Sequence, residues 1–126
     1  MTAADRTAVR YARIALAAAF LSAVGSRLGL WGTWQGFEDW ARTDVLSFVP
    51  AFAVKPMLIA ATIAEGSLGV LLVLGVRPRA VGLAAAALLA IFAVSMALSA
   101  GIKSPLDYSV FSASAAALLV ARMSPR

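Results

Sequence analysis

A single acidic residue, Glu65, stands inside a long apolar stretch of this chain, MLIAATIAEGSLGVLLVLGV at residues 57–76. If the stretch is helical, a rise of about 1.5 Å per residue places this carboxyl group roughly 12 Å from its start. A charge at that depth in a hydrocarbon layer costs at least about 2.5 kcal/mol unless it is neutral, paired or next to water. Glu65 is therefore the candidate catalytic residue, with proton transfer as its chemistry. The alternative is a structural hydrogen bond to Ser95 or Ser99.

Three cationic residues lie at the ends of apolar stretches that an up-and-down bundle would bring to one level. Arg27 ends the first stretch, Lys55 precedes the second and Lys103 ends the third. Positive charges above a buried carboxylate attract small anions or the polar head of a quinone, so these residues are candidates for substrate binding. The alternative is that each long side chain only extends its charge to the membrane surface.

Asp107 and Tyr108 form a third candidate group at the same level, and we assign them to cofactor binding. A tyrosine hydroxyl can form a hydrogen bond with a quinone carbonyl. Both residues also have structural alternatives. Ser104 followed by Pro105 and an acid at the third position is typical of a helix start. Tyrosine is common where a membrane meets water.

The composition indicates that lipid surrounds the elements carrying these residues. Of 126 residues, 62% are hydrophobic and 13% are charged, whereas soluble domains have about 45–50% and 25%. A soluble domain of this size has too much surface to hide so much apolar material. We therefore predict an all-α integral membrane protein with a single domain over residues 1–126.

The sequence contains neither cysteine nor histidine. It therefore has no disulfide, iron–sulfur cluster or cysteine-based zinc site, and we predict no metal site. Redox chemistry would need a bound cofactor, for which we consider quinone, or a partner subunit. The net charge of +5 does not indicate nucleic acid, because the basic residues lie between apolar stretches rather than in one cluster.

Four apolar segments predict a four-helix bundle in a bilayer core about 30 Å thick. We expect the spans at residues 8–27, 55–76, 80–102 and 105–121. Small residues in the second and third spans predict close helix packing. The first segment has arginines before a short apolar stretch, so a secretory signal peptide is its alternative interpretation.

The basic residues are divided unevenly between the two ends of the predicted bundle. One end holds seven: Arg6, Arg10, Arg13, Arg77, Arg79, Arg122 and Arg126. The other holds four: Arg27, Arg42, Lys55 and Lys103. The positive-inside rule then predicts cytoplasmic N and C termini for a multi-pass protein of a bacterial-type inner membrane.

The connection over residues 31–50 is long and rich in aromatic residues. Five apolar residues recur at helical spacing on one face: Trp34, Phe37, Ala41, Val45 and Phe48. The three tryptophans, Trp31, Trp34 and Trp40, fit the level of lipid headgroups. We predict a short helix in the outer interface, with a lid over the bundle as the alternative.

Short motifs spread over nearly the whole chain carry a resemblance to a known family. They are Gly25 to Arg27, Ala64-Glu65-Gly66 through Leu74-Gly75-Val76, the basic turn after it, and Gly101 to Ser109. These motifs resemble the DoxX-like family of small four-helix membrane proteins. The resemblance implies a relation to subunits of a thiosulfate:quinone oxidoreductase or to membrane components of oxidative-stress complexes. By position, it points to Glu65, Arg27 and residues 103–108 as the site.

Three functions are consistent with these patterns. The first is a quinone-reactive subunit of a redox-linked complex, in which Glu65 handles the proton and the cationic residues attract an anionic reductant such as thiosulfate. The second is a non-catalytic subunit that anchors a larger complex or a homo-oligomer through its alanine-rich faces. The third is a small-solute transporter, which the lack of an inverted repeat disfavours.

Overall fold

The computed structural model describes residues 1–124, and this part of the chain is built from helices without strands. The helices are α1 (Ala3–Arg27), α2 (Trp34–Asp44), α3 (Ala51–Leu74), α4 (Pro78–Ala100), α5 (Lys103–Asp107) and α6 (Val110–Met123). Helices α1, α3 and α4 are each long and apolar enough to cross a membrane, and α6 is a shorter apolar helix. The protein is therefore all-α, and its three long apolar helices suit a lipid bilayer.

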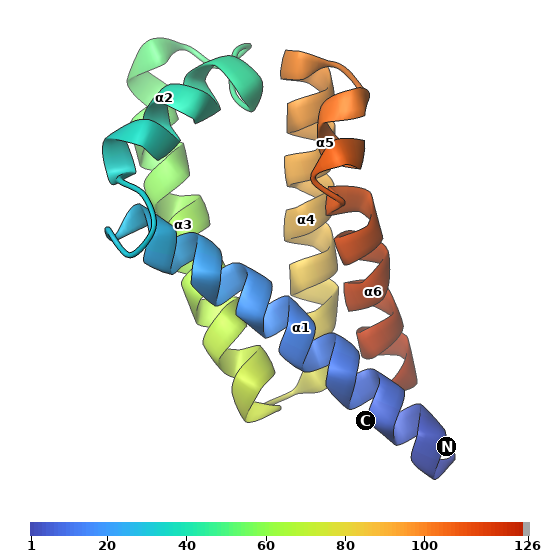
Figure 1. Cartoon of the computed structure of the whole chain (residues 1–126). Helices are drawn as coiled ribbons and strands as arrows, with labels where there is room; N and C mark the ends of the chain where they lie inside the picture. The colour runs from blue at the N-terminus through green and yellow to red at the C-terminus, as the bar shows by residue number, and fades with distance from the viewer. Residues whose placement is uncertain (125–126) are drawn as a thin grey trace.

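The long helices alternate in direction along the chain (Figure 1). The start of α1, the α3–α4 connection and the end of α6 lie at one end of the molecule. Helices α2 and α5 lie at the opposite end, and α1 crosses the molecule obliquely. This arrangement brings the end of α1 and the start of α3 close to α2.

Local sequence signals explain where several helices begin and end. The Thr2 side chain caps α1, and Asp5 returns a hydrogen bond to the Thr2 backbone, which completes a capping box. Helix α3 ends at Gly75, whose φ of 71° is a left-handed conformation that glycine adopts without strain. Pro78 then occupies the first turn of α4, where its missing N–H is not needed.

Small residues allow close helix contacts, as the sequence predicted, but each contact uses a specific pair of helices. A Cβ added to Gly69 of α3 would lie 2.8 Å from Leu21 of α1. A Cβ added to Gly82 of α4 would lie 2.9 Å from the backbone of Ala121 in α6. Ser114 of α6 also donates a hydrogen bond to a backbone carbonyl of α4 at 2.8 Å. The tight pairs are thus α1 with α3 and α4 with α6.

The expected span at residues 105–121 is divided in the structure. Helix α5 begins at Lys103 and makes no side-chain cap, because Ser104 is already inside the first turn and donates its N–H to the Gly101 carbonyl. The prediction that Ser104 caps this helix is therefore wrong. The chain then leaves helical geometry at Ser109, which has a φ of 58°, and α6 starts one residue later.

The expected start of the second span is also shifted. Helix α3 begins at Ala51, directly after Pro50, rather than at residue 55. Pro56 lies inside the helix. Because proline lacks an N–H, one backbone hydrogen bond near the start of α3 cannot form, yet the helix continues past it.

Candidate functional site

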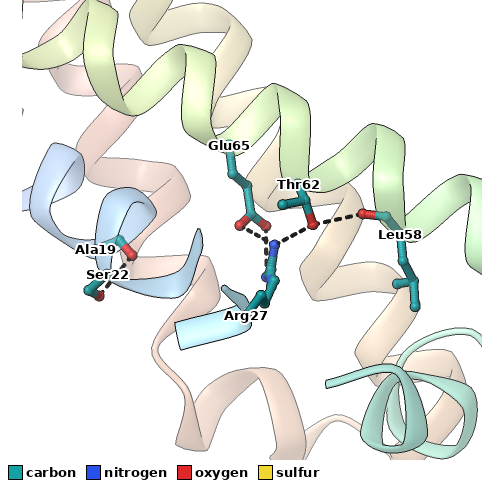
Figure 2. Close-up of polar contacts among 6 residues, drawn as sticks. All are labelled: Ala19, Ser22, Arg27, Leu58, Thr62 and Glu65. Atoms are coloured by element: carbon teal, nitrogen blue, oxygen red, sulfur yellow. Dashed lines mark hydrogen bonds and ion pairs between the residues drawn. The ribbon is translucent and has the colours of Figure 1, made fainter. Parts of the chain in front are cut away.

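The central feature of the candidate site is an ion pair between Arg27 and Glu65 (Figure 2). Arg27 is the last residue of α1, and Glu65 lies in the middle of α3. Arg27 Nη1 lies 2.7 Å from Glu65 Oε2, and Nη2 donates a hydrogen bond to Oε1 at 3.3 Å. The two side chains are only 11% and 3% exposed. The charge that the sequence placed inside an apolar span is therefore paired.

Two further residues fix the Arg27 guanidinium. Its Nη1 donates to Thr62 Oγ1 at 2.9 Å, and the Thr62 hydroxyl donates to the Leu58 carbonyl at 2.8 Å (Figure 2). The ring of Phe37 packs on it, with the guanidinium carbon 3.8 Å from the ring centroid, which is a cation–π contact. Arg27 thus turns into the bundle, and the alternative that it only extends to the membrane surface is wrong.

The alternative partners of Glu65, Ser95 and Ser99, do not bond to it within residues 1–124. Ser99 instead accepts a hydrogen bond from the Ser47 backbone N–H at 3.1 Å. Oε2 of Glu65 accepts no hydrogen bond of good geometry from the described residues, although it lies close to the guanidinium. Among the described residues, the Arg27 guanidinium is therefore the partner of both carboxylate oxygens.

A cavity of about 230 Å³ adjoins the ion pair. Its walls come from α1, α2, α3, α4, Tyr108 and α6. The aromatic residues of the wall are Phe20, Phe37, Trp40, Phe92 and Tyr108. Most other lining residues are alanine, leucine, valine or methionine, and the charged ones are Arg27 and Glu65. The site is thus an apolar chamber with one ion pair in its wall, a composition typical of small-molecule sites.

Helix α2 lines the outer side of this chamber. Ala41 and Val45 are buried against the bundle, and Trp40 meets Tyr108 edge to face with ring centroids 5.9 Å apart. This arrangement favours the lid alternative that the sequence left open. Phe48, which was expected on the same face, is 55% exposed because α2 ends at Asp44 and the helical period stops there.

Glu38 is a buried acid of α2 that the sequence did not single out. It accepts hydrogen bonds from Trp34 Nε1 and from Arg42 Nη2, each at 3.1 Å. The hydrogen bond from the Arg42 guanidinium is the main cause that lowers the pKa of Glu38, and Trp34 adds to the effect. Both partners lie four residues away, which is a helical spacing that could have revealed this group from the sequence.

Of the four remaining candidate residues, three lie outside the chamber and one, Tyr108, lines it. Lys103 Nζ pairs with Asp107 Oδ2 at 2.7 Å on the surface, with side chains 82% and 57% exposed. Lys55 is exposed near the start of α3. Tyr108 lines the chamber while keeping part of its side chain exposed. The structure therefore brings together Arg27, Glu65 and Tyr108, and it leaves the other three candidates at the surface.

Neither protein-family models, curated proteins nor solved structures give a match to this chain. Within residues 1–124 there is also no group of three His, Cys, Asp or Glu side chains that could hold a metal ion. A function for this chain is therefore inferred from the ion pair and the chamber themselves.

Proposed function

We propose that this protein is a quinone-binding membrane module of a redox-linked complex, of the DoxX-like kind. The observation that carries the proposal is the buried Arg27–Glu65 ion pair in the wall of an aromatic-rich apolar chamber. A quinone head group is a flat apolar ring with two carbonyl acceptors. It matches a site that offers aromatic faces and a few fixed polar groups.

The size and chemistry of the chamber fit such a ring. Its volume of about 230 Å³ is somewhat below the roughly 300–1,000 Å³ of pockets that enclose drug-sized ligands. The chamber therefore suits a single ring rather than a larger molecule. Arg27 offers N–H donors to a carbonyl oxygen, and Tyr108, which also lines the chamber, has a hydroxyl group that can donate a second hydrogen bond. Trp40 and Phe37 would pack on the ring faces.

A bound quinone supplies two-electron redox chemistry, which also consumes or releases protons. In this proposal the Glu65 carboxylate accepts a proton and passes it on, and Arg27 keeps that group oriented toward the chamber. Lys55 would attract an anionic reductant such as thiosulfate at the outer surface rather than inside the chamber, whereas the charge of Lys103 is paired with Asp107. A partner subunit would oxidise that reductant, and the quinone would accept the electrons.

We also propose four membrane spans with both termini on the cytoplasmic side of a bacterial-type inner membrane. The three long apolar helices support this topology, and α6 would complete the fourth span together with α5. The arginines from Arg6 to Arg13, Arg77, Arg79 and Arg122 belong to the end of the molecule that holds both termini. Arg126 lies outside the described residues.

This topology can be tested by labelling, because the chain contains no cysteine. Thr7 and Gln35 are exposed on α1 and α2 at opposite ends of the molecule, and each can be replaced by a single cysteine. A membrane-impermeant maleimide added to intact cells should label the Gln35→Cys variant and not the Thr7→Cys variant. The reverse pattern would show the opposite orientation.

The functional proposal is tested by extracting quinone from gently solubilised protein. Wild type should carry quinone, and Glu65→Gln should lose it although glutamine preserves the shape of the side chain. The matched control is Asp39→Asn, which makes the same kind of change at an exposed acid of α2 outside the chamber. Absence of quinone from wild type, or equal retention in Glu65→Gln, would contradict the proposal.

A non-catalytic anchoring subunit is the second candidate, because the same ion pair joins α1 to α3. In that case the pair serves the fold alone, and the protein would associate with a larger complex or with copies of itself. The result that favours this candidate is a wild-type protein without quinone whose stability falls in Glu65→Gln.

A further inference from the structure

A second cavity of about 340 Å³ lies between α3 and α4. Six residues form much of its wall: Met57, Ala60 and Ala64 of α3, and Leu88, Ile91 and Ser95 of α4. Ser95 is the polar residue in a wall that is otherwise apolar. This cavity offers little to a polar ligand and suits a hydrocarbon chain.

The second cavity adjoins the chamber beside the ion pair. Four residues line both spaces: Val45, Leu58, Ala61 and Phe92. At the other side, the walls include Met57 and Ile91, whose side chains are 45% and 61% exposed. The two adjoining cavities together extend from the Arg27–Glu65 pair to these exposed residues, which would meet lipid in a bilayer. We call this apolar route the passage.

There is space between α3 and α4 because α3 makes its close contacts with α1 instead. Gly69 of α3 packs tightly against α1, whereas α3 presents the short side chains of Ala60 and Ala64 to the space before α4. The buried Arg27–Glu65 pair places charged groups, including guanidinium N–H donors, at the inner end of this otherwise apolar route.

We propose that the natural ligand is an amphiphile with a long apolar chain that enters laterally from the bilayer between α3 and α4. Its ring would sit in the chamber beside Arg27 and Glu65, and its chain would run through the second cavity to the lipid. This inference rests on the proposed head-group site. A chain moving from lipid into an apolar cavity gains no hydrophobic energy. The passage therefore decides which ligands can seat, and blocking it excludes long chains.

The test compares two probes with one benzoquinone ring, one carrying a decyl chain and the other a methyl group. Binding to the full chain in lipid nanodiscs is followed by quenching of tryptophan fluorescence, since Trp40 lines the chamber. Ala64→Phe and Ser95→Phe fill the passage from its two walls. Ile63→Phe is the matched control, because Ile63 is 64% exposed on α3 and lines neither cavity.

The expected result is specific to the chain. In both passage variants the decyl probe should bind at least about tenfold more weakly, the effect of a clash of about 1.4 kcal/mol. The methyl probe should bind as in wild type, and Ile63→Phe should change neither probe. Circular dichroism of each variant checks that the helices are intact.

Other results overturn the inference in distinguishable ways. Unchanged binding of the decyl probe in both passage variants would refute the passage while leaving the head-group site in place. Equal weakening of both probes would also refute it, because the effect would not depend on the chain. If wild type is a dimer and Ala64→Phe is a monomer that binds both probes as wild type does, a second copy covers this face and the passage is refuted. If neither probe binds wild type, the proposed function itself fails.

Discussion

Replacing Arg27 with methionine leaves the Glu65 carboxylate buried without its cationic partner. Methionine keeps an unbranched side chain about as long as the arginine stem, so the main change is the loss of the guanidinium. The Glu65 side chain is 3% exposed and therefore has little contact with bulk water that could replace this group. The substitution also removes the hydrogen bond to Thr62 and the contact with the Phe37 ring.

The expected loss of stability follows from this burial. Removing one partner of a buried ion pair costs about 3–5 kcal/mol, because the remaining charge is left uncompensated. The lost hydrogen bond from Arg27 to Thr62 adds little, since the Thr62 hydroxyl keeps its bond to the Leu58 carbonyl. We therefore expect Arg27→Met to lower the free energy of unfolding by about 4 kcal/mol.

The assay is equilibrium unfolding by SDS in mixed micelles, followed by far-ultraviolet circular dichroism. Lys103→Met is the matched control, because its ion pair with Asp107 is exposed, and this variant should change the free energy of unfolding by less than about 1 kcal/mol. If Arg27→Met is no more destabilised than this control, the pair behaves as an exposed one and the reasoning from burial is refuted.

Three further predictions concern the parts that hold the site together. The pKa of Glu38 is lowered in the folded protein, so its contact with Arg42 stabilises α2 fully when the pH is above 4.5, the ordinary pKa of a glutamate. This stabilisation is lost as the pH falls through the lower pKa of the folded state. Tryptophan emission should report the release of α2, and Glu38→Gln should flatten this acid transition. Gly82→Leu should lower the free energy of unfolding by about 1–3 kcal/mol by overpacking the contact with α6, as measured by SDS unfolding. Gly75→Ala should lower it by at least about 1–2 kcal/mol, because alanine is strained at this positive φ and its Cβ meets the Arg13 guanidinium. An acid transition like that of wild type in Glu38→Gln, or SDS unfolding like that of wild type in either glycine variant, would contradict the contact described for that residue.

The residues that the sequence could place are those whose signals are local. Glu65 was evident because one acid in a long apolar run must be buried or paired. The turn after Gly75 was evident because glycine and proline have strong backbone preferences. The amphipathic face of α2 was also visible, except at Phe48, where the helix had already ended.

The parts that the sequence could not supply depend on contacts between distant elements. Arg27 and Glu65 were separate candidates, and only the oblique crossing of α1 over α3 brings their side chains into contact. Composition alone does not distinguish an arginine that reaches the membrane surface from one that turns inward. The break at Ser109 gave no local signal, since serine rarely adopts a positive φ. Lys103 looked available for a ligand until its pairing with Asp107 was visible.

The double variant Arg27→Met/Glu65→Leu separates the role of the ion pair in stability from its role in ligand binding. Gly69 already brings α3 against α1, so apolar side chains at the two positions can hold these helices together without charge. Replacing a buried ion pair by apolar residues of similar volume is often neutral or stabilising. The double variant should therefore unfold like wild type, unlike Arg27→Met alone. If the pair exists for a ligand, the same stable variant should carry no quinone. A stable double variant that retains quinone as wild type does would leave the pair without a role in binding, and the proposal built on it would fall.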